Sequence, residues 1–307
     1  MRTQKLLALA MVVGATSLNV VLASPAQARP AEVGTGACVE GEGHSASARG
    51  GHGADHREVS AKEQRAIARE TKARLRAKGV TRAELKSRSV SVPVYVHVMA
   101  ASDGTGDVTD AQIQAQIDVL NTTFAGGESA NAADTGFSFT LAGTDRYYND
   151  AWHKDHSSSK YRKETRQGGA GALNMWLVDF KYLGIATFPW DYQRNGAIDG
   201  IRVHWDSLPG GGIANYNEGE TATHEAGHWF GLYHTFQGGC TELNDEVHDT
   251  PAQGSPTNGC PIGRDSCALP GLDPIHNYMD YSYDSCYTEF TPGQGTRAQS
   301  MWAAYRS

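Results

Sequence analysis

Apolar residues alternate with other residues from Val90 onward and mark the start of a folded region. In SVSVPVYVHVMA, valines occupy every second position from Val90 to Val98, which is the period of a strand that buries one face. Pro93 lacks a backbone N–H and favours a place near an edge or at the start of this strand. The other stretches that predict strands are residues 137–141, 174–180 and 201–205.

Capping motifs and helical periodicity predict three helices in the same region. A Thr-x-x-Gln box at Thr109 opens the first, and Thr291 followed by proline opens the last. The middle helix begins near Thr221 and carries several histidines. Residues 238–287, rich in Cys, Pro and Gly, predict irregular loops. Residues 89–307 therefore indicate an α+β fold with an irregular portion before its last helix. The apolar faces of the first and last helices comprise Ile113, Ile117 and Leu120, and Ala298, Met301, Trp302 and Tyr305.

Two basic helices precede this region. A Ser-x-x-Glu box at Ser60 opens a Lys/Arg/Ala-rich helix that stops near Gly79, and a Thr-x-x-Glu box at Thr81 opens a short second one. Their apolar stripe is thin, so both helices need a surface to lie on. Residues 29–56, rich in Gly, Ala, Ser and His, predict little fixed structure.

The net charge of −7 conceals a division along the chain. Residues 57–88 carry 11 Lys and Arg against 4 Asp and Glu, whereas residues 89–307 carry 12 against 26. A basic segment joined to an acidic domain is drawn toward it, as expected of a folding aid or an inhibitory pro-segment. The alternative is a solvated basic helix without a partner. The acidic region has no basic patch that would suggest nucleic-acid binding.

The first 28 residues indicate export. Arg2 and Lys5 form a basic start, residues 6–23 are mostly apolar, and Ala26-Gln27-Ala28 matches the small-x-small pattern that signal peptidase accepts. Two polar residues inside the apolar stretch and the Ala-x-Ala end favour a cleaved signal over a membrane anchor. We therefore expect a secreted, extracellular protein without membrane association after signal cleavage. Its environment is oxidising, which permits disulfides.

Four of the five cysteines gather in the last quarter of the chain. Four cysteines allow three pairings, and their spacing does not choose between them. Cys38 stands apart near the start. The clustered cysteines are Cys240, Cys260, Cys267 and Cys286.

The run HEAGHWFGLYH carries the strongest chemical signal. His224 and His228 are four residues apart, so one helix projects both imidazoles from the same face toward one zinc ion. Gly231 permits the positive φ that ends the helix, and the chain can then bring His234 to the metal as third ligand. Glu225 lies beside the metal and is suited to act as general base and then acid toward the metal-bound water. Three protein ligands and an open position indicate a catalytic zinc.

The remaining histidines lack ligand spacing, and we interpret them as structural. Those considered are His97, His153, His156, His204, His248 and His276.

The extended motif HExxHxxGxxH resembles that of the metzincins, which place a methionine in a turn beneath the metal. Met279 in NYMDYS is the matching residue. Together with HEAGHWFGLYHTF, the segment from Cys240 through DEVHDTP, and the tail EFTPGQ, it resembles the pappalysin family of metzincins, particularly its ulilysin-like secreted members. The resemblance covers most of residues 89–307. It implies an upper lobe of twisted mixed sheet with two helices, and an irregular, disulfide-bonded lower lobe ending in a helix.

The same resemblance implies roles for further residues. The disulfides would be Cys240–Cys267 and Cys260–Cys286, and Tyr281 would approach the metal and stabilise the oxyanion. The loop with Asp245, Val247 and Thr250 resembles one that binds structural calcium, although a turn held by hydrogen bonds is the alternative. Cys38 would close the fourth zinc position in a latent form, with a free or intermolecular thiol as the alternative because its context GACVEG departs from the usual pattern.

The sequence as a whole predicts a zymogen of a secreted zinc metalloendopeptidase. Its parts are a signal peptide (1–28), a pro-segment (29–88) that partners its own catalytic domain, and a catalytic domain (89–307) acting on proteins or peptides as a monomer. Cleavage among the basic residues of 57–88, such as after Arg88, would release the active form. A zinc-stabilised, non-catalytic binding module and a surface adhesin are the alternatives, but neither needs Glu225.

Overall fold

The valine-rich strand β1 (Val90–Ala100) lies inside a five-stranded sheet in the computed structural model, which describes residues 59–307. The strand order is β2-β1-β3-β5-β4, with four parallel strands and β4 antiparallel at one edge. Pro93 lies one residue before the pairing of β1 with β3 begins at Val94. The missing N–H therefore falls where β1 is paired on one side only. The other strands are β2 (Phe137–Tyr148), β3 (Leu173–Val178), β4 (Gly184–Ala186) and β5 (Ile201–His204).

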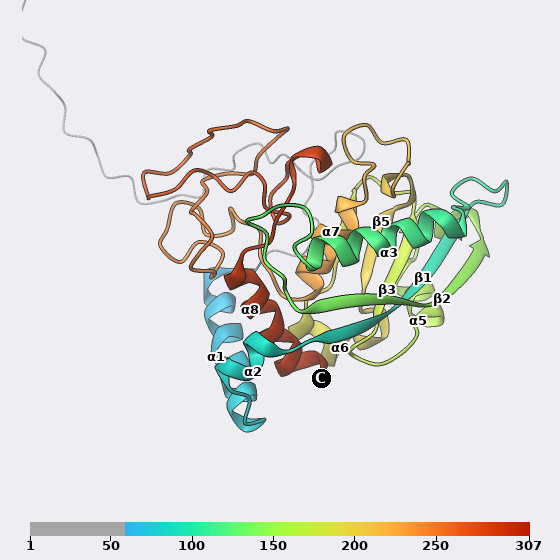
Figure 1. Cartoon of the computed structure of the whole chain (residues 1–307). Coiled ribbons are helices and arrows are strands. Elements are labelled where there is room, and N and C mark those ends of the chain that lie inside the picture. The colour runs from blue at the N-terminus through green and yellow to red at the C-terminus, as the bar shows by residue number, and fades with distance from the viewer. Residues whose placement is uncertain (1–58) are drawn as a thin grey trace, which may run out of the picture. The chain divides into compact units, whose positions relative to one another are not determined.

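Helices α3 (Asp110–Phe124) and α7 (Glu220–Trp229) pack against each other and against strands of this sheet. The capping box at Thr109 is formed as predicted, with both reciprocal hydrogen bonds. The predicted apolar face of α3 enters the main core with alternate β1 valines. Residues 89–231 form what we call the upper lobe (Figure 1).

Residues 232–307 form the lower lobe, which consists of loops up to helix α8 (Pro292–Met301) and a terminal π-helical turn η5 (Trp302–Arg306). Between residues 232 and 291 the described chain has only two isolated bridges and no strand. Met279 and Phe290 nevertheless join the same core as the sheet. The lobes thus share one hydrophobic interior.

A buried ion pair closes the end of the chain onto the upper lobe. Arg306 donates to Asp199 at 2.9 Å and to the carbonyl of Trp229 at 3.1 Å, and its guanidinium lies 3.6 Å from the Trp229 ring centroid. Trp229 in turn donates its indole N–H to Asp199. The terminal turn is therefore attached to the last residue of α7.

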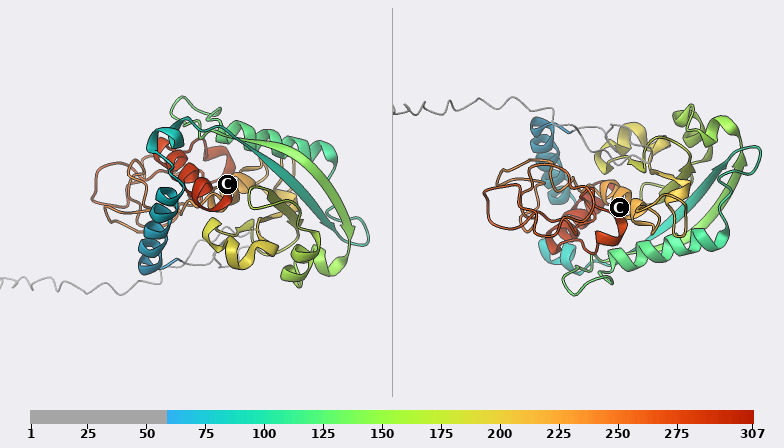
Figure 2. Two further views of the ribbon diagram at one scale, coloured as in Figure 1. Left: turned by 90° about the horizontal axis from the view of Figure 1, so that it is seen from below. Right: turned by 90° about the horizontal axis from the view of Figure 1, so that it is seen from above.

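Helices α1 (Ala61–Ala77) and α2 (Arg82–Ser87) flank α8 and η5 (Figures 1 and 2). The thin apolar stripe finds its surface here, because Ile67 packs in a cluster with Met301 and Tyr305. Arg74 pairs with Glu70 within α1 and also lies over the Tyr305 ring of η5. The contacts of these helices with α8 and η5 thus include apolar packing and a cation–π contact.

The structure also contains short elements that the sequence pattern did not predict. Besides β4, they include two helices between β2 and β3, and several short helical turns. Their bounds are α4 (Asp150–His153), α5 (Ser158–Thr165), η1 (Pro189–Asp191), α6 (Tyr192–Asn195), η2 (Gly196–Ile198), η3 (Trp205–Ser207) and η4 (Asp284–Cys286).

Candidate zinc site

Helix α7 carries His224 and His228 on one buried face. It ends before the chain turns back and brings His234 toward them. Gly231 has φ +92°, its N–H donates to the His228 carbonyl, and Leu232 N–H donates to the Gly227 carbonyl. This pair of hydrogen bonds is a Schellman helix end, which needs a residue with positive φ. A Cβ at Gly231 would also lie 2.7 Å from Met301. Glycine is therefore required both by backbone conformation and by space.

The three histidines converge on one point. Their Nε2 atoms are separated by 3.3 Å (His224 to His234), 3.2 Å (His224 to His228) and 3.1 Å (His228 to His234). Zinc bound tetrahedrally to nitrogen at 2.0–2.1 Å requires nitrogen–nitrogen separations of about 3.3 Å. The donor set and its geometry therefore fit a zinc ion.

Backbone carbonyls fix the other side of two of these rings. His224 Nδ1 lies 2.6 Å from the Tyr278 carbonyl, and His228 Nδ1 lies 2.9 Å from the Leu232 carbonyl. A carbonyl can only accept, so each Nδ1 carries the proton and each Nε2 presents its lone pair. Converging lone pairs repel one another unless a cation lies between them.

Met279 lies directly beneath the catalytic helix. A Cβ placed on Gly227 would be 2.3 Å from the Met279 sulfur, so the helix approaches this residue as closely as glycine allows. Met279 N–H is held by the Asn277 side chain, and the amides of Asn277 and Gln294 exchange two hydrogen bonds. The methionine turn is thereby attached to the first turn of α8.

Aromatic rings surround the third histidine. Phe236 stacks on His234 with 4.6 Å between centroids and 10° between planes. Tyr281 contacts His234 edge-on at 4.8 Å and also packs against Phe236 at 5.1 Å. Tyr281, which the family resemblance implies near the metal, thus contacts His234, and Phe236, which spacing alone did not single out, stacks on the same ring.

Glu225 is almost completely buried (1% exposed) and lies against the edge strand β4.

At the N-terminal end of α7, the Asp284 carboxylate accepts the N–H of Glu218 at 2.9 Å and so holds the loop before the helix. Burial raises the pKa of Asp284 to about 7. The catalytic helix is therefore anchored at both ends by lower-lobe residues.

The loop carrying Asp245, Val247 and Thr250 gathers buried oxygens. Asp245 is fully buried, one carboxylate oxygen accepts the Val247 N–H at 2.9 Å, and the other has no hydrogen-bond partner among residues 59–307. The same is true of the Thr250 hydroxyl and of the Asn244 side-chain oxygen within the described chain. Burial raises the pKa of Asp245 to about 7. Buried oxygens without donors are the kind of environment that a calcium ion satisfies.

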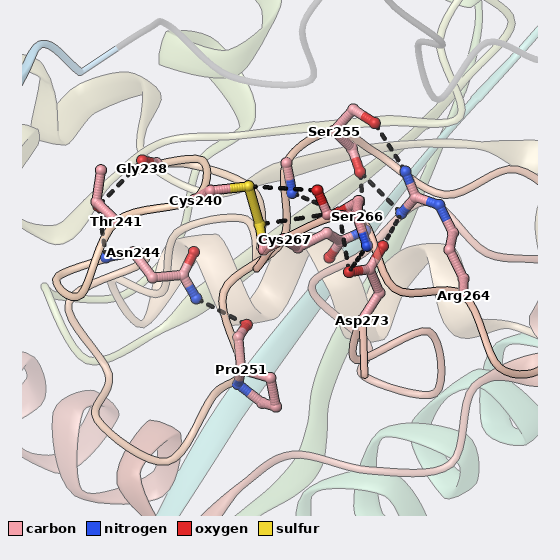
Figure 3. Close-up of a disulfide and its surroundings, with 12 residues drawn as sticks. Gly238, Cys240, Thr241, Asn244, Pro251, Ser255, Arg264, Ser266, Cys267 and Asp273 are labelled. Carbon is pink, nitrogen blue, oxygen red and sulfur yellow. Dashed lines mark hydrogen bonds and ion pairs between the residues drawn. A yellow bond between two sulfur atoms is a disulfide. The ribbon is translucent and has the colours of Figure 1, made fainter. Parts of the chain in front are cut away.

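Two disulfides connect the loops of the lower lobe, and their pairing is the one that the family resemblance implies: Cys240–Cys267 and Cys260–Cys286. Figure 3 shows the first of them, with Ser266 and Asp273 beside it. Ser266 donates to Asp273 and accepts the Gly254 N–H, so side-chain hydrogen bonds continue the cross-link into the neighbouring loop.

Cys38 and the signal region lie outside the described residues, so the predictions for them stay predictions. Of the histidines interpreted as structural, His97, His153 and His276 bond to an Asn174 side chain, the Met99 carbonyl and the Cys286 carbonyl respectively. No helix among residues 59–307 is long and apolar enough to cross a membrane.

Arg297 is a further residue near the site that sequence reasoning missed. It donates to the Gly231 carbonyl at 2.9 Å and to Glu246 at 3.0 Å, and it lies over the Tyr233 ring. It thereby joins the turn between the second and third histidines to the Asp245 loop. An arginine on the partly exposed side of a helix has no spacing signal that would have indicated this.

Known proteins are similar to this chain in sequence and in structure. Residues 184–303 match the M43 peptidase family, described as pregnancy-associated plasma protein-A. An extracellular metalloprotease of Podospora anserina is 46% identical over 241 residues, covering 75% of this chain and 80% of its own. One of Neurospora crassa is 46% identical over 246 residues, covering 78% and 82%.

Two solved structures from Tannerella forsythia are also similar. Mature mirolysin in complex with a cleaved peptide is 29% identical with a TM-score of 0.61, covering 69% of this chain and 91% of its own. A promirolysin mutant is 26% identical with a TM-score of 0.63, covering 81% and 94%. The coverage of this chain is thus larger for the pro form than for the mature form.

Proposed function

Since the chain belongs to the pappalysin family and is an extracellular zinc-dependent metalloendopeptidase with the metzincin fold, we propose that His224, His228 and His234 hold its zinc ion. The observation that carries this proposal is the set of three Nε2 atoms 3.1–3.3 Å apart. When bound, zinc would supply Lewis acidity that activates a water molecule and polarises the peptide carbonyl.

Glu225 is the residue we propose as general base. It follows His224 on α7 and is 1% exposed, so its carboxylate would lie beside the metal in a site from which bulk water is largely excluded. It would accept one proton from the attacking water and return that proton to the departing amine, which balances the hydrolysis. Tyr281, which packs against His234, would donate a hydrogen bond from its hydroxyl to the oxyanion.

The edge strand β4 offers a docking surface for the substrate backbone. It pairs with β5 on one side only within the described sheet, and it lies next to Glu225. An extended peptide can add to such an edge through main-chain hydrogen bonds. We propose that the peptide substrate binds there as an additional strand, which brings its scissile carbonyl to the histidines.

A single substitution tests the chemistry. Glu225→Gln keeps the size of the side chain but cannot accept the proton, so hydrolysis of casein should fall by at least ~100-fold while zinc content remains at the wild-type level. Chelation should abolish activity in the wild type, and added zinc should restore it. Full proteolysis by the Glu225→Gln protein would contradict the assignment, and absence of hydrolysis by the zinc-loaded wild type would favour the non-catalytic binding module.

A calcium ion in the Asp245 loop is the second cofactor that we propose. Asp245 and Thr250 would bind it through their side chains and Val247 through its carbonyl. The proposal is supported by the buried oxygens of this loop and by the absence of a donor for one Asp245 oxygen among the described residues. No basic side chain is bonded to that carboxylate within the same part of the chain.

We also propose the division into signal peptide (1–28), pro-segment (29–88) and catalytic domain (89–307), with activation after Arg88. In support, α1 and α2 lie outside the sheet-and-helix unit and dock on it, with Lys78 donating to backbone oxygens of Ala303 and Ser307. Val59 belongs to the same apolar cluster as Tyr233, and its carbonyl accepts from Gln237 at 3.2 Å, so the segment approaches residues that flank His234. Loss of the Cys38 thiol, as in Cys38→Ser, would give premature activity if that residue enforces latency.

The mature enzyme would act as a monomer on protein or peptide substrates, without nucleic acid. Residues 89–307 carry 26 acidic and 12 basic residues, and this negative charge supports the expectation that the enzyme does not bind nucleic acid.

A further inference from the structure

Gly184 is the first residue of β4, and its neighbours show which way its side chain would point. Side chains alternate between the two faces of a strand. Ala186 lies in the main core with Ala222 and Ala226 of α7, whereas Ile185 packs against the separate cluster on the opposite face. Position 184 shares the face of Ala186 and therefore points toward α7.

Glu225 occupies the space that a side chain at this position would need. A Cβ built on Gly184 would lie 2.3 Å from Oε1, 2.4 Å from Cγ and 2.6 Å from Cδ of Glu225. Carbon atoms that are not bonded do not approach this closely, since the optimum is about 3.5–4.0 Å. Gly184 is not among the glycines with positive φ, so backbone conformation does not demand glycine. The demand comes from Glu225.

We propose that Gly184 is a positioning residue for Glu225, whose carboxylate lies where any other residue would place its Cβ. This inference rests on the proposed role of Glu225 as general base. Rotation about the Cα–Cβ bond of Glu225 moves Cγ, Cδ and Oε1 together, so we expect a methyl group at position 184 to be accommodated by another rotamer of Glu225 rather than by movement of the paired strand. The consequence falls on proton transfer and not on folding.

Catalysis is sensitive to such a displacement. A general base must lie within about 2.6–3.2 Å of the proton that it accepts, and misplacement by about 1 Å can cost ~100-fold in rate. The substrate backbone and the zinc ligands do not depend on the position of the Glu225 carboxylate. Binding and metal content should therefore be retained while turnover is lost.

The first experiment compares Gly184→Ala with Gly169→Ala in the mature secreted enzyme, using a fluorogenic peptide substrate. For Gly184→Ala we expect kcat to fall by about 100-fold, KM to change by less than about threefold, and zinc content and Tm to match the wild type. Gly169 lacks a positive φ, and a Cβ added there would meet nothing within 4 Å. Its alanine variant should keep wild-type kcat.

The second experiment combines Gly184→Ala with Glu225→Gln, which keeps the size of the side chain but removes the base that Gly184 is proposed to position. Because the two changes act on the same carboxylate, their combined loss in kcat should be smaller than the product of the separate losses. Multiplicative losses would overturn the inference. So would a wild-type kcat in Gly184→Ala, or a kcat loss fully explained by lost zinc or lowered Tm.

The outcomes also separate this inference from the function on which it rests. An active Glu225→Gln enzyme contradicts the proposed function itself. An inactive Glu225→Gln enzyme together with a fully active Gly184→Ala enzyme leaves the function intact and contradicts only the role of Gly184.

Discussion

The two lobes meet at the three histidines, but they are held in shape by different means. The upper lobe is a sheet whose backbone groups satisfy one another, covered by two helices with apolar faces. The lower lobe has no described strand between residues 232 and 291. There, side chains hold the backbone: Gln253, for example, bridges the Ser255 carbonyl, Thr257 and Asp280.

This difference determines how each lobe contributes to the site. The upper lobe supplies residues from regular elements, such as His224 and Glu225 on α7. The lower lobe supplies contacts from loops, namely the Tyr278 carbonyl that orients His224 and the Met279 side chain below the helix. A regular element keeps its geometry through many equivalent hydrogen bonds. A loop keeps it through a few particular ones, so single changes in the lower lobe should have larger local effects.

Removing a disulfide should produce the largest effect and should be confined to the lower lobe. Cys260→Ser with Cys286→Ser opens a loop of 26 residues and should lower the free energy of unfolding by about 3 kcal/mol. Hydrogen exchange should show lost protection in residues 256–290, whereas the amides of β1 and β3 keep theirs at low denaturant.

The matched control for this prediction is the pair Cys240→Ser and Cys267→Ser, which opens a loop of 27 residues. Both double variants should lose similar stability, but only the first should weaken zinc binding, because Cys286 lies close to the methionine turn and its carbonyl holds His276 at 2.6 Å. Equal protection losses in both lobes would show that the lobes unfold as one unit, contrary to the comparison.

The buried Asp245 predicts the next largest effect, a change in how stability depends on pH. In calcium-free buffer its folded-state pKa of about 7 lies above the unfolded value of about 3.9. The folded state therefore binds this proton more tightly than the unfolded state does. The stability that protonated Asp245 contributes is fully present below pH ~4 and is lost as pH rises through ~7. Calcium should remove this loss, because the ion stabilises the charged carboxylate.

Thermal unfolding of wild type and Asp245→Asn from pH 4 to 8 measures this effect. The variant should be less sensitive to pH without calcium and should not be stabilised by calcium. Burial also raises the pKa values of Glu220, Asp280 and Asp284, but these groups are present in both proteins. The exposed Asp265→Asn should leave the calcium response unchanged. A calcium response that persists in Asp245→Asn would place the ion elsewhere.

The sequence predicted the parts of the fold that depend on local patterns. Valine alternation identified β1, and capping residues located α3 and α8, because strand period and helix caps are properties of a few adjacent residues. Strand β4 was missed because Gly-Ile-Ala is too short to show a period, and its pairing with β5 is what makes it a strand. The extension of β2 to Tyr148 was missed because its second half is only partly buried and does not alternate.

For the site, too, the sequence predicted the residues that follow a local pattern but not the contacts made by distant segments. His224, Glu225, His228, Gly231 and His234 fall within eleven residues, so spacing along a helix and one turn was enough to predict their convergence. The contacts that orient them come from distant segments: Gly184 on β4, the Tyr278 carbonyl and Arg297 on α8. A backbone carbonyl, or a glycine that leaves space for a neighbouring side chain, has no sequence pattern of its own. Only the folded chain reveals which of them lie next to the histidines.

The smallest predicted effect concerns a helix-capping motif that occurs once in each lobe. Thr109 and Thr291 each cap a helix in a Thr-x-x-Gln box with both reciprocal hydrogen bonds formed. In the upper lobe, Thr109 has only this role among its described hydrogen bonds, so Thr109→Ala should cost about 1 kcal/mol. Thr291 also donates to Asp249 at 2.7 Å, which attaches the loop after Val247 to the start of α8.

Thr291→Ala should therefore cost more than Thr109→Ala, by roughly the 1 kcal/mol of one further hydrogen bond to a charged group, partly exposed to solvent. Thr291→Ser and Thr109→Ser retain the hydroxyl and should restore most of each loss. Chemical denaturation of the four variants measures the difference. Equal losses for the two alanine variants would mean that the side-chain bonds of the lower lobe add nothing to the cap. The comparison of the lobes would then rest on the disulfides and the Asp245 loop alone.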